Sequence, residues 1–213
     1  MIVIFDWDGT LCDSLDQIVA AMQAAASELN ESVPAPAQVR DIVGLGLPEA
    51  VSRLFPGVAA ARRDELRASY SRHFLEGDQG PPRLYPGALK VLETLRSRGL
   101  ELAVATGKSR RGLNRVLGNL DMADYFETSR CADETRSKPH PLMVEEILDE
   151  RGKRPEQAVV VGDTEYDLEM AARAGVASIG VSFGVHAAER LQRHQPVSIV
   201  DRLDELLDVS LLR

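Results

Sequence analysis

Short runs of consecutive apolar residues recur along this chain, and amphipathic helical patterns separate most of them. Continuous runs of this kind are typical of strands that are covered on both faces of a sheet. They occupy residues 2–5, 102–105, 158–161 and 176–181, with a weaker run at 125–131. Helical patterns accompany the later runs at residues 88–98, 110–120, 141–151 and 166–174. The alternation predicts an α/β fold built on a doubly wound, Rossmann-like parallel sheet.

The stretch after the first run lacks this alternation, because its patterns are all helical. They cover residues 15–29, 48–54 and 62–75. Pro34 and Pro36 are expected to separate the first helix from the others. The sequence therefore predicts an α/β core formed by residues 1–14 and 84–213, with residues 15–83 inserted as an all-helical cap domain. An insertion at this point lies at the carboxyl edge of the sheet, where ligands bind, so we interpret it as a lid rather than as helical decoration.

The composition is that of an ordinary globular protein of 213 residues, 44% hydrophobic and 27% charged. Acidic residues outnumber basic ones by 33 to 25, and the net charge of −8 argues against binding of nucleic acid or of anionic membranes. The two cysteines, Cys12 and Cys131, do not make a disulfide framework. The first residues lack the features of a signal peptide, and no run is long enough to span a membrane. We therefore expect a cytoplasmic protein, and whether it is a monomer or a dimer stays open.

The segment FDWDGT places two aspartates directly after the first predicted strand. Asp6 ends the apolar run, and Asp8 follows two residues later, before Gly9. Two carboxylates about 4 Å apart in a partly buried site repel each other by about 4 kcal/mol, which calls for a cation or a shared proton. Since the segment offers only oxygen ligands, the cation would be a hard one, Mg²⁺. The alternative is a solvated turn, because the pattern D-x-D-G is also common turn chemistry.

The segment ATGKSR follows the second predicted strand and ends like a Walker A loop. Such a loop needs a glycine five residues before Gly107, and Leu102 stands there, so we exclude a P-loop. What remains is Thr106 at the end of a strand, before a helix whose backbone N–H groups can bind an anion. The alternative is a helix cap formed by Thr106 or Ser109.

Two further segments, SKPHP and GDTEYD, carry charged residues before or at the start of predicted helices. Lys138 lies in the first, and Asp163 and Asp167 lie about one helical turn apart in the second. Taken alone, they fit a solvated lysine and an acidic first helical turn. Strand ends of a doubly wound sheet converge on one crevice, however, which would gather the carboxylates as a metal site and the lysine as part of an anion site. Such a set of groups is suited to phosphoryl transfer.

The four segments, in this order and spacing, resemble the four motifs of the haloacid dehalogenase superfamily, and the resemblance covers the whole chain, including the helical cap. It implies a phosphatase that forms an aspartyl-phosphate on Asp6. Asp8 would protonate the leaving group and then activate water. The resemblance also implies that Mg²⁺ binds Asp6, Asp163 and the backbone carbonyl of Asp8, with Asp167 acting through a water or a neighbouring ligand.

The same resemblance assigns the phosphoryl group to a second set of residues. Thr106 would hydrogen-bond the group, and Lys138 would steady both the nucleophile and the developing charge. Thr10 and Gly107, from the first two motifs, are expected to bind phosphate as well.

The identity of Asp8 separates the branches of the superfamily. Dehalogenases lack an acid at this position because a halide needs no proton, whereas an alkoxide does. Sugar-phosphate mutases keep the acid but tend to carry an arginine in a cap loop, where this chain has VGLGLPEA at residues 43–50. Gly44 and Gly46 would make that loop a backbone-lined cover for a small substrate. The chain is similar to phosphoglycolate phosphatases, which implies hydrolysis of phosphoglycolate or a similar small organic phosphate, and a mutase or a pyrophosphatase stays an alternative.

A rival from another class is a receiver domain, which accepts a phosphoryl group as a signal. Receiver domains carry no helical insertion and have no acid two residues after the phosphoacceptor, so we favour the phosphatase. The expected partner is a small phosphorylated metabolite. Lys108, Arg110 and Arg111 follow Thr106 closely, and they either contact this substrate or form a solvated helix face.

Overall fold

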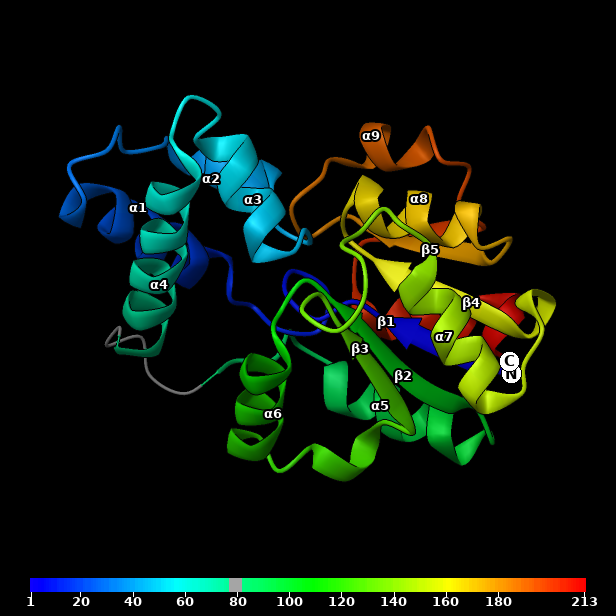
Figure 1. Ribbon diagram of the computed structural model, residues 1–213. Helices are drawn as coiled ribbons and strands as arrows, with labels where there is room; N and C mark the ends of the chain where they lie inside the picture. Colours follow the sequence, from blue (N-terminus) through cyan, green and yellow to red (C-terminus); the bar gives the residue numbers. More distant parts are fainter. Residues whose placement is uncertain (77–81) are drawn as a thin grey trace.

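The computed structural model describes residues 1–76 and 82–213. Within these residues, six parallel strands form one sheet in the order β3-β2-β1-β4-β5-β6 (Figure 1). The strands are β1 (Ile2–Phe5), β2 (Glu101–Thr106), β3 (Thr128–Cys131), β4 (Ala158–Gly162), β5 (Ala177–Val181) and β6 (Ser198–Val200). This order confirms the predicted doubly wound sheet. Strand β1 pairs with β2 on one side and β4 on the other, and the strand order reverses there, which leaves a crevice at the carboxyl ends of these strands.

Helices cover both faces of the sheet, which explains why its central strands are continuous apolar runs. One face carries α5 (Ala88–Ser97) and α6 (Arg110–Asn119), and the other carries α7 (Leu142–Arg151) and α8 (Glu165–Arg173). Because successive strand residues point to opposite faces, Val3 and Phe5 join the first apolar cluster, and Ile2 and Ile4 join the second. In the described part of the chain, no helix has both the length and the apolar character that a membrane crossing needs.

Between β1 and α5 the chain forms a separate helical block. It contains α1 (Leu15–Glu28), α2 (Pro36–Asp41), α3 (Leu47–Leu54) and α4 (Ala60–Glu76). Its apolar side chains form a further cluster, in which α1 packs against α4, and Tyr166 of α8 joins this cluster from the core. Figure 1 shows the block beside the sheet, not as one of the layers that cover it. The predicted cap extends to residue 83, and its residues 77–81 lie outside the described residues.

Some elements differ from the sequence-based prediction. Helix α2 was not predicted, and Pro36 begins it, at a position where its missing N–H costs nothing. The run at 125–131 pairs only from Thr128 onward, as β3, because Ala123–Tyr125 forms a 3₁₀ helix. Strand β6 and helix α9 (Ala188–Gln192) were not predicted, because three and five residues are too few to show a period. Further short 3₁₀ helices span Pro155–Gln157, Leu203–Asp208 and Ser210–Leu212.

Candidate active site

Lys138 is a buried lysine that holds two aspartates together at the carboxyl edge of the sheet. Its Nζ lies 2.6 Å from Oδ1 of Asp6, which follows β1, and 2.6 Å from Oδ1 of Asp167, in the first turn of α8. Burial lowers the pKa of Lys138, but the charges of Asp167 and Asp6 outweigh this effect and raise the pKa above its ordinary value. Three residues that were predicted from separate motifs therefore meet as one buried ionic group.

Asp163, which follows β4, lies beside this group and is held at both of its oxygens. Oδ1 accepts a hydrogen bond from the Thr10 hydroxyl, and Oδ2 accepts one from the backbone N–H of Val185, each at 2.8 Å. Gly9 has a φ of +90°, and a Cβ there would come within 2.3 Å of Oδ2 of Asp163, so only glycine fits. The contact from Val185 was not predicted, because a backbone N–H leaves no signal in the sequence.

Three of the carboxylates are close enough to share one cation. Oxygens of Asp6, Asp163 and Asp167 lie within 4.8 Å of one another, and all three side chains are buried. Oδ2 of Asp6 has no hydrogen-bond partner among the described residues. Burial, together with the neighbouring carboxylates, raises the pKa of Asp6 and raises the pKa of Asp163 to about 7. A buried, unpartnered oxygen in a crowded acidic group fits Mg²⁺, a cation that prefers oxygen ligands.

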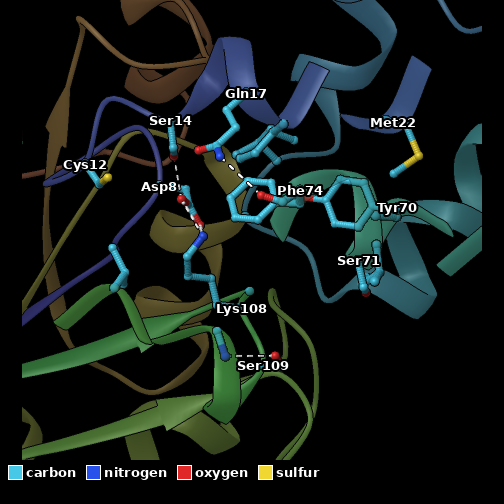
Figure 2. A pocket seen from close by; sticks show the side chains of 18 of the residues that line it. Asp8, Cys12, Ser14, Gln17, Met22, Tyr70, Ser71, Phe74, Lys108 and Ser109 are labelled. Carbon is cyan, nitrogen blue, oxygen red and sulfur yellow. Dashed lines mark hydrogen bonds and ion pairs between the residues drawn. The ribbon is translucent and has the colours of Figure 1, made fainter. Parts of the chain in front are cut away.

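Asp8 does not join these carboxylates, because its side chain faces a cavity (Figure 2). Both of its oxygens lie 2.9 Å from Nζ of Lys108, and Oδ1 also accepts a hydrogen bond from the Ser14 hydroxyl. The Lys108 ammonium lies 4.8 Å from the ring centre of Phe74 on α4, so one cation contacts both the core and the helical block. Neither the ion pair nor the Ser14 contact was predicted.

Thr106 ends β2 with a buried hydroxyl that accepts a hydrogen bond from the Lys108 backbone N–H at 3.2 Å. Ser109, not Thr106, caps the N-terminus of α6. Gly107 packs directly on the loop before α3, since a Cβ there would come within 2.5 Å of the carbonyl oxygen of Leu45. The helical block therefore touches the predicted phosphate site.

A cavity of about 730 Å³ lies between the helical block and the core, and it reaches Asp8. The block lines it mainly with apolar side chains of α1, α4 and the loop before α3. The core lines it with α6, along its whole length, and with the turn before α6, where Lys108 and Ser109 lie (Figure 2). Lys108 and Arg111 line the cavity and remain candidates for substrate contact. Arg110 does not, because its guanidinium pairs with Glu134 at 2.7 Å beside β3.

A second set of contacts, which we call the clasp, joins the helical block to the core through Asp41, Tyr166, His186 and Arg190. The carboxylate of Asp41, at the end of α2, pairs with the Arg190 guanidinium on α9. The backbone carbonyl of Asp41 accepts a hydrogen bond from the Tyr166 hydroxyl at 3.0 Å. His186 is buried beside the pair, and this burial lowers its pKa. The clasp was not predicted, because its members lie on four separate segments.

Comparisons with known proteins agree with this geometry. The profile of the haloacid dehalogenase-like hydrolase family matches residues 3–181. A curated relative named "Probable phosphatase IndB", from Dickeya dadantii, is 33% identical over 98% of this chain and 93% of its own length. A phosphoglycolate phosphatase from Vibrio vulnificus is 28% identical over 99% of this chain and 96% of its own length. The crystal structure of a haloacid dehalogenase-like hydrolase from Bacteroides fragilis has a TM-score of 0.90 at 26% identity, over 96% of this chain and 98% of that one.

Proposed function

The chain belongs to the haloacid dehalogenase-like hydrolase family, and on this premise we propose that it is a Mg²⁺-dependent phosphatase acting through an aspartyl-phosphate. Its substrate would be a small phosphomonoester, phosphoglycolate or a similar small organic phosphate. The observation that carries the proposal is the buried ionic group of Asp6, Lys138 and Asp167 beside Asp163, next to a cavity that also presents Asp8. The relatives named as phosphatases, which match over nearly the whole chain, support it.

Asp6 is the proposed nucleophile. One of its carboxylate oxygens forms a bond to phosphorus while the bond between phosphorus and the alcohol oxygen breaks, which leaves the phosphoryl group on Asp6. Lys138, 2.6 Å from the carboxylate, holds it in place and offsets the negative charge that develops. Asp167 fixes the lysine from its other side.

Asp8 is the proposed acid and base. It gives a proton to the departing alcohol oxygen, and it then takes a proton from the water that attacks phosphorus and releases Asp6. Since Asp8 is paired with Lys108, a phosphoryl group that enters the cavity competes for the same ammonium. This competition frees Asp8 for proton transfer when a substrate is bound.

The phosphoryl oxygens are held by Thr106 and by the backbone N–H of Gly107, which follow β2. Thr10 is proposed to contact phosphate as well, although its hydroxyl hydrogen is donated to Asp163 here. Asp6, Asp163 and the backbone carbonyl of Asp8 would hold Mg²⁺, which would supply positive charge to the transferring group.

We propose that the helical block, with the connection up to residue 83, acts as a lid domain over this site. The cavity lies between the block and the core, and the two parts touch at Gly107, at Lys108 and at the clasp, among other points. A closed lid excludes bulk water and strengthens every charge interaction on the phosphoryl group. The partner of the protein is then a phosphorylated metabolite small enough to fit beneath the lid.

The test is release of inorganic phosphate from an aryl phosphate and from phosphoglycolate. We expect turnover with Mg²⁺, less with Ca²⁺, which takes more ligands at longer distances, and none in excess chelator. Asp6→Asn is nearly isosteric, so it should abolish turnover while the fold survives. Full activity in chelator or in this variant would overturn the proposal. A mutase would isomerise a sugar phosphate without net phosphate release, so product analysis separates that alternative.

A further inference from the structure

Two aromatic rings follow one another along the wall of the cavity next to Asp8. Phe74 and Tyr70 lie one turn apart on α4, with ring centres 5.8 Å apart and ring planes inclined by 31°. The ring of Phe74 is 4.8 Å from Nζ of Lys108, which is 2.9 Å from Asp8. Lys108, Phe74 and Tyr70 therefore follow one another from Asp8, the proposed acid, along the cavity. In Figure 2 the ring of Phe74 lies between Asp8 and Tyr70.

The position of Asp8 fixes which part of a substrate meets this wall. An acid that protonates the leaving group must touch the alcohol oxygen, so the body of the alcohol extends from Asp8 into the same cavity. Ile18 and Met22 of α1 continue the wall with apolar side chains. Among the described residues, the charged side chains that line the cavity all come from the core, so the wall formed by the block is uncharged. They are Asp6, Asp8, Lys108, Arg111 and Arg115.

The volume of the cavity bears on the size of that alcohol. Ligand pockets of about 300–1,000 Å³ bury most of the surface of a drug-sized molecule, and this cavity measures about 730 Å³. A two-carbon acid would leave most of such a space to water. An alcohol that bears a ring would fill it and remove apolar surface from water.

We propose that the preferred substrate is the phosphomonoester of an alcohol that carries a planar aromatic ring, with this ring packed against Phe74 and Tyr70. The inference rests on the proposed phosphatase function and, among small phosphomonoesters, favours a ring-bearing alcohol over phosphoglycolate. Aromatic pairs gain stability beyond the area that they bury, which favours a planar ring over an aliphatic group of the same size. Burial and the charge of Asp8 raise the pKa of the Tyr70 hydroxyl, which stays a hydrogen-bond donor for a polar atom on the ring.

The test compares ethyl phosphate with 2-phenylethyl phosphate in the presence of Mg²⁺. Both release a primary alcohol of similar acidity, so a difference in kcat/KM reports contacts of the ring rather than leaving-group chemistry. We expect kcat/KM for 2-phenylethyl phosphate to be about 10- to 100-fold higher, the range that burial of one phenyl ring supports. Equal values, or a preference for ethyl phosphate, would overturn the inference. So would a 2-cyclohexylethyl phosphate that performs as well as the phenyl compound.

Two variants test whether the preference for 2-phenylethyl phosphate depends on the aromatic side chains that line the cavity. Tyr70→Leu keeps the wall apolar and removes one ring, so the ratio of kcat/KM for 2-phenylethyl over ethyl phosphate should fall about tenfold. Tyr125→Leu is the matched control, because Tyr125 stacks with Arg96 on the core and does not line the cavity. An equal loss in both variants would contradict the inference. If no phosphomonoester is hydrolysed at all, the proposed phosphatase function is wrong. If ethyl, 2-phenylethyl and 2-cyclohexylethyl phosphate are hydrolysed with similar kcat/KM, only the proposed substrate class is wrong.

Discussion

At the scale of single residues, Lys138 shows how a buried charge is tolerated in this protein. Removing an ion from water costs several kcal/mol, and close contacts with two carboxylates offset that cost. Asp163 adds a third carboxylate to the group, which therefore retains negative charge around one lysine. This imbalance is the physical reason to expect that a divalent cation stabilises the folded protein.

The first prediction concerns pH and Mg²⁺. Burial raises the pKa of Asp163 from 3.8 to about 7, and it raises the pKa of Asp6 as well. Between the unfolded and folded pKa values, the folded protein binds more protons than the unfolded chain. The contribution of these two groups to the free energy of unfolding therefore falls as pH rises. We expect Mg²⁺ to take the place of those protons, so the gain in Tm on adding Mg²⁺ should be larger at about pH 8 than at about pH 5. Thermal unfolding checks this, with Asp163→Asn as the control that should lose the difference.

A second prediction tests the role of Asp8 as the acid that protonates the leaving group. Asp8→Asn should lower kcat by about 10²–10⁴-fold, the usual effect of losing an acid–base group. The loss should be smaller for aryl phosphates than for alkyl phosphates, because a good leaving group needs less protonation. Steady-state rates for the two substrate types measure this difference. An equal loss for both would show that Asp8 does not protonate the leaving group.

Some residues of the candidate site could be predicted from the sequence, and others could not. Asp6, Asp163 and Lys138 could be predicted, because each stands at a strand end or before a helix in a readable motif. The ion pair between Lys108 and Asp8 could not, because it depends on how two loops 100 residues apart fold toward each other. The aromatic wall on α4 could not be predicted either, since a helical period shows which residues share a face but not what that face meets.

At the scale of elements, the burial of a strand determines how clearly the sequence predicts it. Strands β1, β2 and β4 lie in the middle of the sheet, covered on both faces, and their apolar runs are unmistakable. The edge strands β3 and β6 are half exposed and short, so their patterns are weak or absent. The turn after β2 is likewise determined by packing, because the helical block lies against Gly107.

A third prediction tests that contact. Gly107→Ala would place a Cβ within 2.5 Å of the Leu45 carbonyl oxygen, which must push the helical block away from the site. We expect a stability loss of about 1–3 kcal/mol, the usual result of overpacking, together with a lower kcat/KM. Gly118→Ala on α6 is the control, because a Cβ there meets nothing within 4 Å. That change should stabilise the helix by about 0.5–1 kcal/mol, and urea unfolding measures both variants.

At the scale of the whole molecule, two apolar clusters cover the sheet and a third holds the helical block together. The block meets the core through the clasp, through Gly107 and through Tyr166, which joins its apolar cluster. A part that buries most of its apolar side chains within itself is suited to move as a unit. The sequence predicted the block and its place at the carboxyl edge of the sheet, but not the contacts of the clasp, because no motif marks them.

A fourth prediction follows from the clasp. Asp41→Ala removes the ion pair with Arg190 and leaves the pair between Arg190 and Glu165 in place. The side chain of Asp41 is 52% exposed, so the loss of stability should be below about 1 kcal/mol. KM should nevertheless rise, because closure of the block over the substrate becomes less favourable. Arg173→Ala is the control, since Arg173 pairs with Glu169 within α8. Equal KM values for both variants would show that the clasp has no part in closure.

The central claim is that Asp6 carries the phosphoryl group during turnover, and trapping that intermediate tests it most directly. The enzyme, turning over an aryl phosphate with Mg²⁺, is quenched with borohydride, which reduces an acyl phosphate to an alcohol, and its peptides are analysed by mass spectrometry. Our account predicts that the side chain of Asp6, and not that of Asp8, is found reduced. Continued turnover with Asp6 unmodified, or reduction at another carboxylate, would contradict it.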